Sequence, residues 1–142
     1  NSEKLATSIE LTAKEIAKEL KFDVVRKSLK EVKVDDLAAM EFAVVVISTW
    51  GEGDPPGPAE KFCKELYTAS SPKLTNMKYA VLAMGDRAYQ DFCGCGRRVD
   101  ESIKGLGATQ ILPRQDMDLD YSAHFEKWEI ELFTKIAPML KG

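Results

Sequence analysis

The sequence is poor in the residues that most metal and hydrolytic sites need. It has a single histidine, His124, so a histidine-based metal site or a Ser-His-Asp triad would depend on that one side chain. Its three cysteines, an odd number, do not indicate a disulfide framework. Cys93 and Cys95 are one residue apart, a spacing unsuited to a metal knuckle. We therefore expect reduced thiols, a cytoplasmic protein and no metal site.

Long apolar runs and an excess of positive charge are also missing. No run approaches the roughly 20 apolar residues that cross a bilayer, and no signal-like segment precedes the first predicted element. The net charge is −3, whereas nucleic-acid-binding proteins normally carry a basic excess. We therefore expect neither a membrane segment nor nucleic-acid binding. The 142 residues, 44% hydrophobic and 30% charged, suit one soluble domain spanning residues 1–142.

Apolar residues recur with helical and strand periodicities in alternation. Helices are predicted at residues 2–20 and 59–67, around Val99, Ile103 and Leu106 up to a left-handed cap at Gly107, and from 125 to 139. Buried strands are predicted at 42–47, 79–84 and 109–112, with an edge strand at 22–26 and an irregular segment at 28–40. This order predicts an α/β fold in three layers, a doubly wound, mostly parallel sheet with helices on both faces.

Three loops that follow predicted strands carry unusual residues. They span residues 48–56, 85–93 and 114–120. Ligands of open α/β sheets bind beyond the carboxyl ends of the strands, and the first two loops place Trp50 and Tyr89 there. Two facing aromatic rings form a slot for a flat ring. The glycines of the first loop, Gly51 and Gly53, allow the backbone to approach such a ring closely.

Acidic side chains surround this predicted slot. They are Glu52, Asp54, Asp86, Asp116 and Asp118. Carboxylates disfavour a bare phosphate but suit a neutral heterocycle whose anionic reduced form is destabilised, by roughly 1–4 kcal/mol per close charge pair near a surface. Taken singly, these features are typical of packing, of Gly-Pro turns and of solvated loops. Their conjunction at neighbouring strand ends favours a binding site.

Three motifs match a known family. Ser48 to Pro56 read S-T-W-G-E-G-D-P-P, Ala83 to Cys93 read A-M-G-D-R-A-Y-Q-D-F-C, and Leu106 to Asp118 fit L-G-A-x-x-x-L-P-R-x-D-x-D. In these motifs the chain resembles the FMN-binding, flavodoxin-like domain of the diflavin reductases. This group includes the sulfite reductase flavoprotein, the cytochrome reductases and the nitric oxide synthase reductase region. The chain departs from the family in having Ala-Met where Gly-Leu is usual and Trp50 where most members have tyrosine.

The resemblance implies FMN as the cofactor and a role for each matching residue. Trp50 and Tyr89 would stack on the two faces of the isoalloxazine ring, and the Trp50–Gly51 peptide would switch its hydrogen bonding near the central ring. Ser48 and Thr49 would meet the phosphate and the ring edge. The full set of implied cofactor-binding residues is Asn1, Ser2, Ser48, Thr49, Trp50, Gly51, Glu52, Gly53, Met84, Gly85, Asp86, Arg87, Ala88, Tyr89, Phe92, Cys93 and Asp118. No catalytic residue and no metal ligand is implied.

The start of the chain departs most from the family. Members open with a strand and a phosphate loop of the form x-[ST]-x-T-G-N-[SA]-E, and residues 1–3 match only the tail of that loop. We therefore expect the family's first strand and most of its phosphate loop to be missing from this chain. That would leave two sheet edges unpaired and remove most donors to the phosphate.

The resemblance implies an electron-transfer module of an NADPH-dependent diflavin oxidoreductase. Single electrons would pass from an FAD- and NADPH-binding reductase domain, in cis or in trans, to a haem protein or metalloprotein. The residues leave open a cofactor-free flavodoxin-fold interaction or signalling module. A phospho-receiver would need a lysine after the last strand, where Pro113 and Arg114 stand. An NADP-binding domain would need G-x-G-x-x-G, which the glycines of the first loop do not continue.

Overall fold

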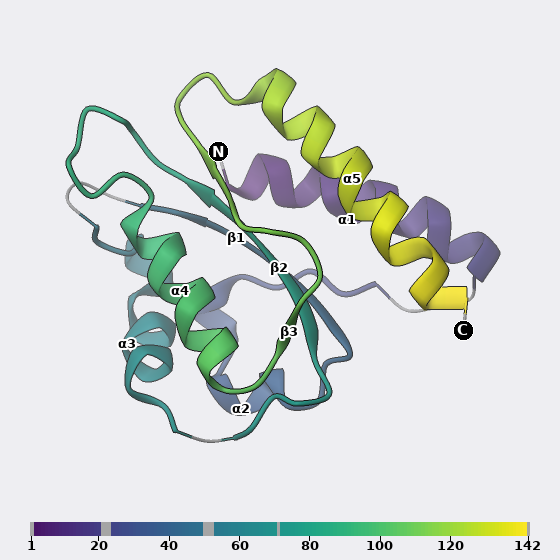
Figure 1. The fold of residues 1–142 in the computed structure, drawn as a ribbon, viewed down its shortest axis with the longest axis horizontal. Coiled ribbons are helices and arrows are strands. Elements are labelled where there is room, and N and C mark those ends of the chain that lie inside the picture. Colours follow the sequence, from purple (N-terminus) through teal and green to yellow (C-terminus); the bar gives the residue numbers. More distant parts are fainter. Residues whose placement is uncertain (1, 21–23, 50–52, 71, 142) are drawn as a thin grey trace.

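A computed structural model describes residues 2–20, 24–49, 53–70 and 72–141 (Figure 1). Its helices and strands are α1 (Ser2–Leu20), α2 (Val34–Leu37), β1 (Phe42–Ser48), α3 (Glu60–Thr68), β2 (Lys78–Met84), α4 (Gly94–Gly105), β3 (Thr109–Gln110), β4 (Gln115–Met117) and α5 (Ser122–Lys141). Single 3-10 turns occupy Leu29–Glu31 and Gly57–Ala59. The long helices and the strands β1 and β2 lie where the apolar periodicity predicts them.

Every strand pairing in the described segments is parallel. β1 pairs with β2 along its whole length, from Phe42 opposite Lys78 to Ser48 opposite Met84. On its other side β2 pairs first with β3 and then, at its carboxyl end, with β4. The strand predicted at 109–112 is therefore shorter than expected, and β4 was not predicted. Pro113 lies between the two pieces and has no N–H to donate to a ladder, which explains the break.

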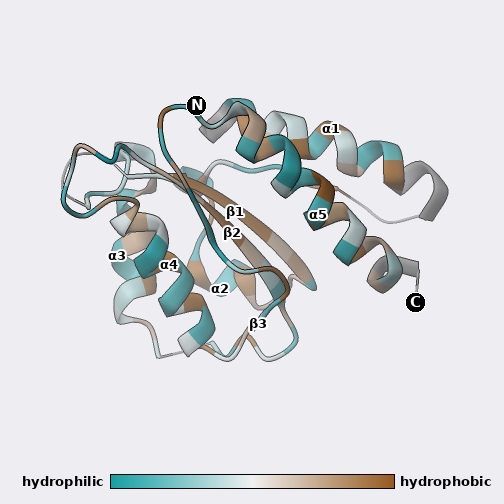
Figure 2. Cartoon of the chain, turned by 45° about the horizontal axis from the view of Figure 1, so that its top comes forward, coloured by the Kyte–Doolittle hydropathy of each residue, from teal (hydrophilic) through white to brown (hydrophobic). Residues whose placement is uncertain are grey.

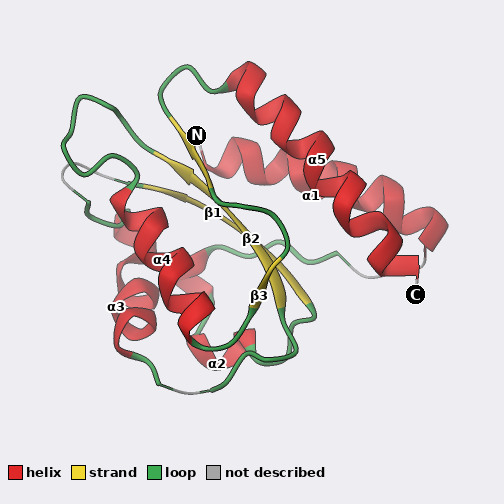
Figure 3. Ribbon diagram, viewed as in Figure 1, coloured by secondary structure: helices red, strands yellow, loops and turns green. Residues whose placement is uncertain are grey.

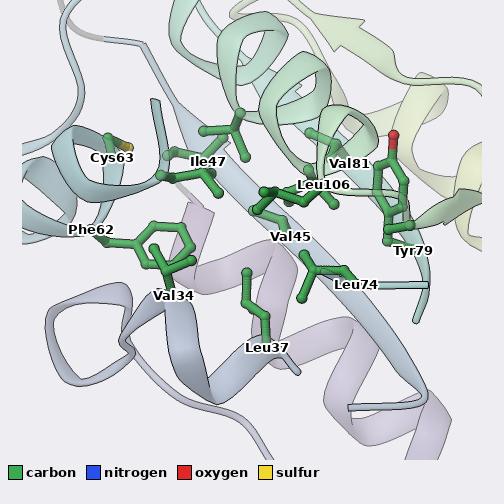
Figure 4. Packing of buried hydrophobic residues seen from close by; sticks show 14 of the residues in the cluster. Val34, Leu37, Val45, Ile47, Phe62, Cys63, Leu74, Tyr79, Val81 and Leu106 are labelled. Carbon is green, nitrogen blue, oxygen red and sulfur yellow. The ribbon is translucent and has the colours of Figure 1, made fainter. Parts of the chain in front are cut away.

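Helices cover both faces of the sheet (Figures 1 and 3). Side chains alternate along a strand, so Val81 and Leu82 of β2 point to opposite faces. Val81 packs with α3 and α4, in the cluster drawn in part in Figure 4, and Leu82 packs with α1 and α5. In Figure 2 the hydrophobic colours of β1 and β2 lie between these helical layers. The predicted three-layer α/β fold is confirmed.

The predicted edge strand at 22–26 is wrong over its described part. Residues 24–26 have no regular structure, and Val25 is 72% exposed. An extended segment becomes a strand only when a neighbour accepts its backbone hydrogen bonds, and within the described ranges β1 has a single strand neighbour, β2. Residues 24–26 therefore have no ladder to join, and residues 22 and 23 lie outside the described part.

The segment at 28–40, predicted to be irregular, contains α2. The backbone N–H of Lys33 donates to the carboxylate of Asp36 at 2.9 Å and so satisfies a donor at the start of the helix. Val34 and Leu37 bury their side chains at 6% and 3% exposure. A helix of one turn is too short to produce a periodic pattern, which explains why the sequence did not reveal it.

The last turn of α4 ends as predicted. Gly107 has a φ of 101°, a left-handed value that favours glycine, and its N–H donates to the carbonyl of Lys104 at 3.0 Å. Among the helices of the described segments, none has the length and apolar character needed to span a membrane.

Candidate functional site

Three loops leave the sheet at one edge. Ser48, Met84 and Met117, which end β1, β2 and β4, lie in matching register on neighbouring strands. The N–H of Thr49 donates to the carbonyl of Met84 at 2.8 Å, and that of Gly85 donates to the carbonyl of Met117 at 2.9 Å. The loops therefore start side by side, at the carboxyl edge where α/β sheets bind ligands.

The second loop exposes an aromatic ring. The carboxylate of Asp86 accepts the N–H of Ala88 at 2.9 Å, and the backbone carbonyl of Asp86 accepts the N–H of Tyr89 at 3.1 Å. These bonds form a tight turn of the kind that aspartate favours. Tyr89 follows this turn with 43% of its surface exposed. The second loop thus exposes an aromatic side chain at the carboxyl edge of the sheet, where it can stack against a ligand.

Arg87 joins the second loop to the turn after β4. Its N–H donates to the carboxylate of Asp118 at 3.1 Å, and its guanidinium lies 3.5 Å from the same carboxylate. The guanidinium also lies over the ring of Phe92, at 4.6 Å from the ring centroid. Asp118 therefore links the second loop to the turn after β4.

We expect the contact between Arg87 and Asp118 to weaken at low pH. The pKa of Asp118 is lowered, first by the backbone N–H of Leu119, then by that of Arg87 and by the charge of the Arg87 guanidinium. A lowered pKa means that the contact is complete above the ordinary aspartate pKa and is lost as pH falls through the lowered one. The Arg87 amide resonance should report this transition at a pH below the pKa of an unperturbed aspartate, which is about 4.

The matched control for this titration is Asp118→Asn. It keeps an oxygen acceptor but cannot ionise, so the low-pH shift of the Arg87 amide should disappear. A transition at the ordinary aspartate pKa in the parent protein, or one that persists in Asp118→Asn, would contradict the assignment.

Cys93, the last residue of the second loop, attaches this loop to the end of β4. It has a φ of 55°, the one left-handed value among the described non-glycine residues, and its side chain is fully buried. Its thiol donates to the carbonyl of Met117 at 3.8 Å. Burial raises the pKa of this thiol to about 12, so it stays protonated and inaccessible at neutral pH. Cys93 can therefore contribute only its backbone to a bound ligand.

A second polar cluster pairs one of the predicted acidic residues. The carboxylate of Asp116 receives two bonds from the guanidinium of Arg114, at 2.7 and 3.2 Å. Arg114 also reaches the carboxylate of Asp100, which is 8% exposed and accepts the hydroxyl of Tyr79 at 2.8 Å. The expectation that Asp116 adds free negative charge to the slot is therefore wrong, because an arginine neutralises it.

The remaining predicted site residues divide into three groups. Asn1, Trp50, Gly51 and Glu52 lie outside the described residues. Met84 is 4% exposed and packs in the core against α1 and α5, so its side chain is not available at the edge. Ser2 begins α1, and Figures 1 and 2 place the start of this helix at the same end of the sheet as the three loops.

Two residues that the sequence did not single out, Asp91 and Arg98, connect the two aromatic-bearing loops. Arg98 of α4 donates to the carbonyl of Gly53 at 2.9 Å and pairs with the carboxylate of Asp91. Two successive arginines shortly after an aspartate-bearing loop were the only available signal.

The described ranges contain no group of three or more His, Cys, Asp or Glu side chains that could hold a metal ion. A surface hollow of about 330 Å³ lies elsewhere, between α1 and α5. It is lined by Thr12, Glu129, Ile130, Phe133 and Thr134, and it contains no residue of the three loops.

Relatives of known name resemble the chain in sequence. It is 38% identical over 119 residues to the "Sulfite reductase [NADPH] flavoprotein alpha-component" of Mannheimia succiniciproducens, covering 82% of this chain and 20% of the relative. It is 37% identical over 107 residues to the protein of the same name from Bacillus subtilis, covering 75% of this chain and 18% of the relative. The chain thus spans about a fifth of these relatives, which bear out the resemblance drawn from the motifs.

Solved flavodoxins resemble the chain in structure. The Streptococcus pneumonia TIGR4 flavodoxin matches with a TM-score of 0.79 at 22% identity, over 98% of this chain and 91% of the flavodoxin. A cysteine-to-serine mutant of the Pseudomonas aeruginosa flavodoxin matches with a TM-score of 0.75 at 25% identity, over 100% and 92%. A family model described as "Flavodoxin" matches residues 5–128. On this evidence of fold and sequence together, the chain belongs to the flavodoxin family.

Proposed function

We propose that the chain binds FMN at the carboxyl edge of its sheet and transfers single electrons. The observation that carries this proposal is the meeting of three loops at that edge, with Tyr89 exposed on one of them. An exposed aromatic ring at the edge of the sheet can stack on a flat heterocycle, and so suits such a ligand better than a small polar substrate. FMN supplies one-electron redox chemistry when bound, while the protein binds and tunes it.

The described residues fit the ring part of FMN. Tyr89 supplies one stacking face, and Trp50, which lies outside the described residues, would supply the other. The turn at Asp86 and the link from Arg87 to Asp118 brace the loop that carries Tyr89.

The negative charge of the carboxylates around the proposed site favours a flavin that donates electrons readily. Asp86 lies on the second loop, and a carboxylate near the ring disfavours added negative charge by roughly 1–4 kcal/mol at surface distances. Asp116 and Asp118 add less to this effect because Arg114 pairs with the first and Arg87 with the second. The rim should therefore lower the potential at which the flavin takes its second electron.

The partners would be an FAD- and NADPH-binding reductase domain and a haem or metalloprotein acceptor. The name of the relatives, an NADPH-dependent sulfite reductase flavoprotein, supports the first. Exposed acidic residues near the site, Asp54 and Asp120, would attract a basic acceptor surface. Leu119, on the third loop, is 66% exposed beside them in the sequence and offers an apolar contact to such a surface. Weak redox encounters of this kind bury little surface.

A reductive titration of the FMN-loaded protein tests the function. Stepwise addition of dithionite under anaerobic conditions should reduce the flavin in two separate one-electron steps, followed in the visible spectrum. Reduction in a single two-electron step would contradict a one-electron carrier. A protein that takes up no flavin at all would favour the alternative, a cofactor-free interaction module.

A further inference from the structure

The first two turns of α4 bind the two residues that flank segment 50–52 of the first loop. The backbone N–H of Cys95 donates to the hydroxyl of Thr49 at 3.0 Å. One turn later, Nη1 of Arg98 donates to the carbonyl of Gly53 at 2.9 Å. Thr49 and Gly53 flank residues 50–52, so the two ends of this segment are attached to the same helix.

The same helical turns also hold the second loop. The N–H of Gly94 donates to the carbonyl of Asp91 at 3.0 Å. The Asp91 carboxylate is shared between two guanidinium groups, with Arg97 Nη2 at 2.8 Å from Oδ1 and Arg98 Nη2 at 2.5 Å from Oδ2. The Arg98 side chain therefore bonds to both loops at once.

The fit around Arg98 depends on glycine at position 53. Gly53 has a φ of 100°, and a Cβ there would lie 2.3 Å from the Asp91 carboxylate and 2.8 Å from Arg98 Nη1. The carboxylate thus occupies the space in which a side chain at position 53 would stand. This close approach lets one guanidinium span the two loops.

We propose that Arg98 is a positioning residue that sets the separation between the loop carrying Trp50 and the loop carrying Tyr89. The inference rests on the proposed function, since that separation matters only if a ring binds between the loops. The guanidinium bonds a carbonyl with one nitrogen and a carboxylate with the other. A lysine ammonium is a point charge without this fork and cannot reproduce both bonds in the same geometry.

Arg98→Gln is the test variant and Arg97→Gln the matched control. The two arginines pair with the same carboxylate from the same helix, and their side chains are similarly exposed, at 40% and 43%. They differ in the bond to Gly53, which Arg98 makes. We expect Arg98→Gln to weaken FMN binding about tenfold, the equivalent of one charge-assisted hydrogen bond, and Arg97→Gln to weaken it by about twofold. Arg98→Lys should not restore the parent affinity.

Two further readouts separate positioning from general stability. At saturating FMN, the visible circular dichroism of the flavin should change in Arg98→Gln and not in Arg97→Gln, because only the former alters the space around the ring. Amide hydrogen exchange without flavin should accelerate at both 49–54 and 86–92 in Arg98→Gln, and at 86–92 alone in Arg97→Gln.

The outcomes distinguish this inference from the proposed function. A parent protein that binds FMN, with equal affinities and exchange patterns in the two variants, would overturn the role of Arg98 alone. A parent protein that binds no FMN would overturn the proposed function. In that case the exchange pattern still decides whether Arg98 couples the loops.

Discussion

Replacing Gly96 with alanine is expected to lower the free energy of unfolding by about 2–3 kcal/mol, the cost of overpacking a filled core. Gly96 lies in α4 where the helix crosses β2, and a Cβ there would stand 2.3 Å from the Cβ of Ala83. Real Cβ atoms do not approach so closely, so the helix would have to move away from the strand. The beginning of α4 holds both aromatic-bearing loops, so the same shift should also weaken flavin binding.

Gly105→Ala is the matched control in the same helix. Nothing lies within 4 Å of a Cβ at position 105, which is exposed. Alanine should be neutral there or stabilise the protein, by up to about 1 kcal/mol from helix propensity. Urea denaturation of both variants measures the difference. Equal changes at the two positions would show that α4 does not pack on β2 as described.

Trp50→Ala is expected to weaken FMN binding by about 1–3 kcal/mol, the value of stacking a base on an aromatic side chain. In the proposed site this residue forms one face of the slot, and alanine offers no ring to replace it. Fluorescence quenching of added FMN measures the affinity. Trp50→Tyr is the control. Tyrosine is the usual residue at this position in the diflavin reductases, and its ring should keep most of the affinity.

An unchanged affinity in Trp50→Ala would place the ring elsewhere. Equal losses in Trp50→Ala and Trp50→Tyr would also count against stacking, because both then reflect a disturbed loop. The stability of each variant against urea should stay close to that of the parent protein.

The long elements could be predicted because their apolar periodicity is strong. The continuous apolar run of β2 follows from burial on both faces, and the spacing in α1 and α5 follows from burial on one. In β1, which was also predicted to be buried, one face buries Val45 and Ile47, whereas Phe42, Val44 and Val46 on the other face are only partly buried. The failures were short elements. β4 has three residues and exists because it pairs with the end of β2, and α2 is a single turn. Pairing and packing of this kind depend on tertiary neighbours, which local sequence does not reveal.

The sequence predicted where the candidate site lies, but not which contacts its side chains make. Motifs located the three loops and the exposed Tyr89. The sequence could not show that Met84 faces the core, that Asp116 is paired with Arg114, or that Arg98 reaches Gly53. Each of these depends on which face of an element meets another element, so a list of matched motif positions overestimates the number of side chains available to a ligand.

A comparison of riboflavin with FMN by NMR tests the central claim most directly. Riboflavin has the ring without the phosphate, so ring binding by the described loops should be visible with either ligand. We expect both to shift the amide resonances of residues 85–92 and 116–119, with little change in α5 beyond residue 128. Shifts confined to the hollow between α1 and α5, or none at saturating concentrations of both ligands, would contradict a flavin site at the carboxyl edge of the sheet.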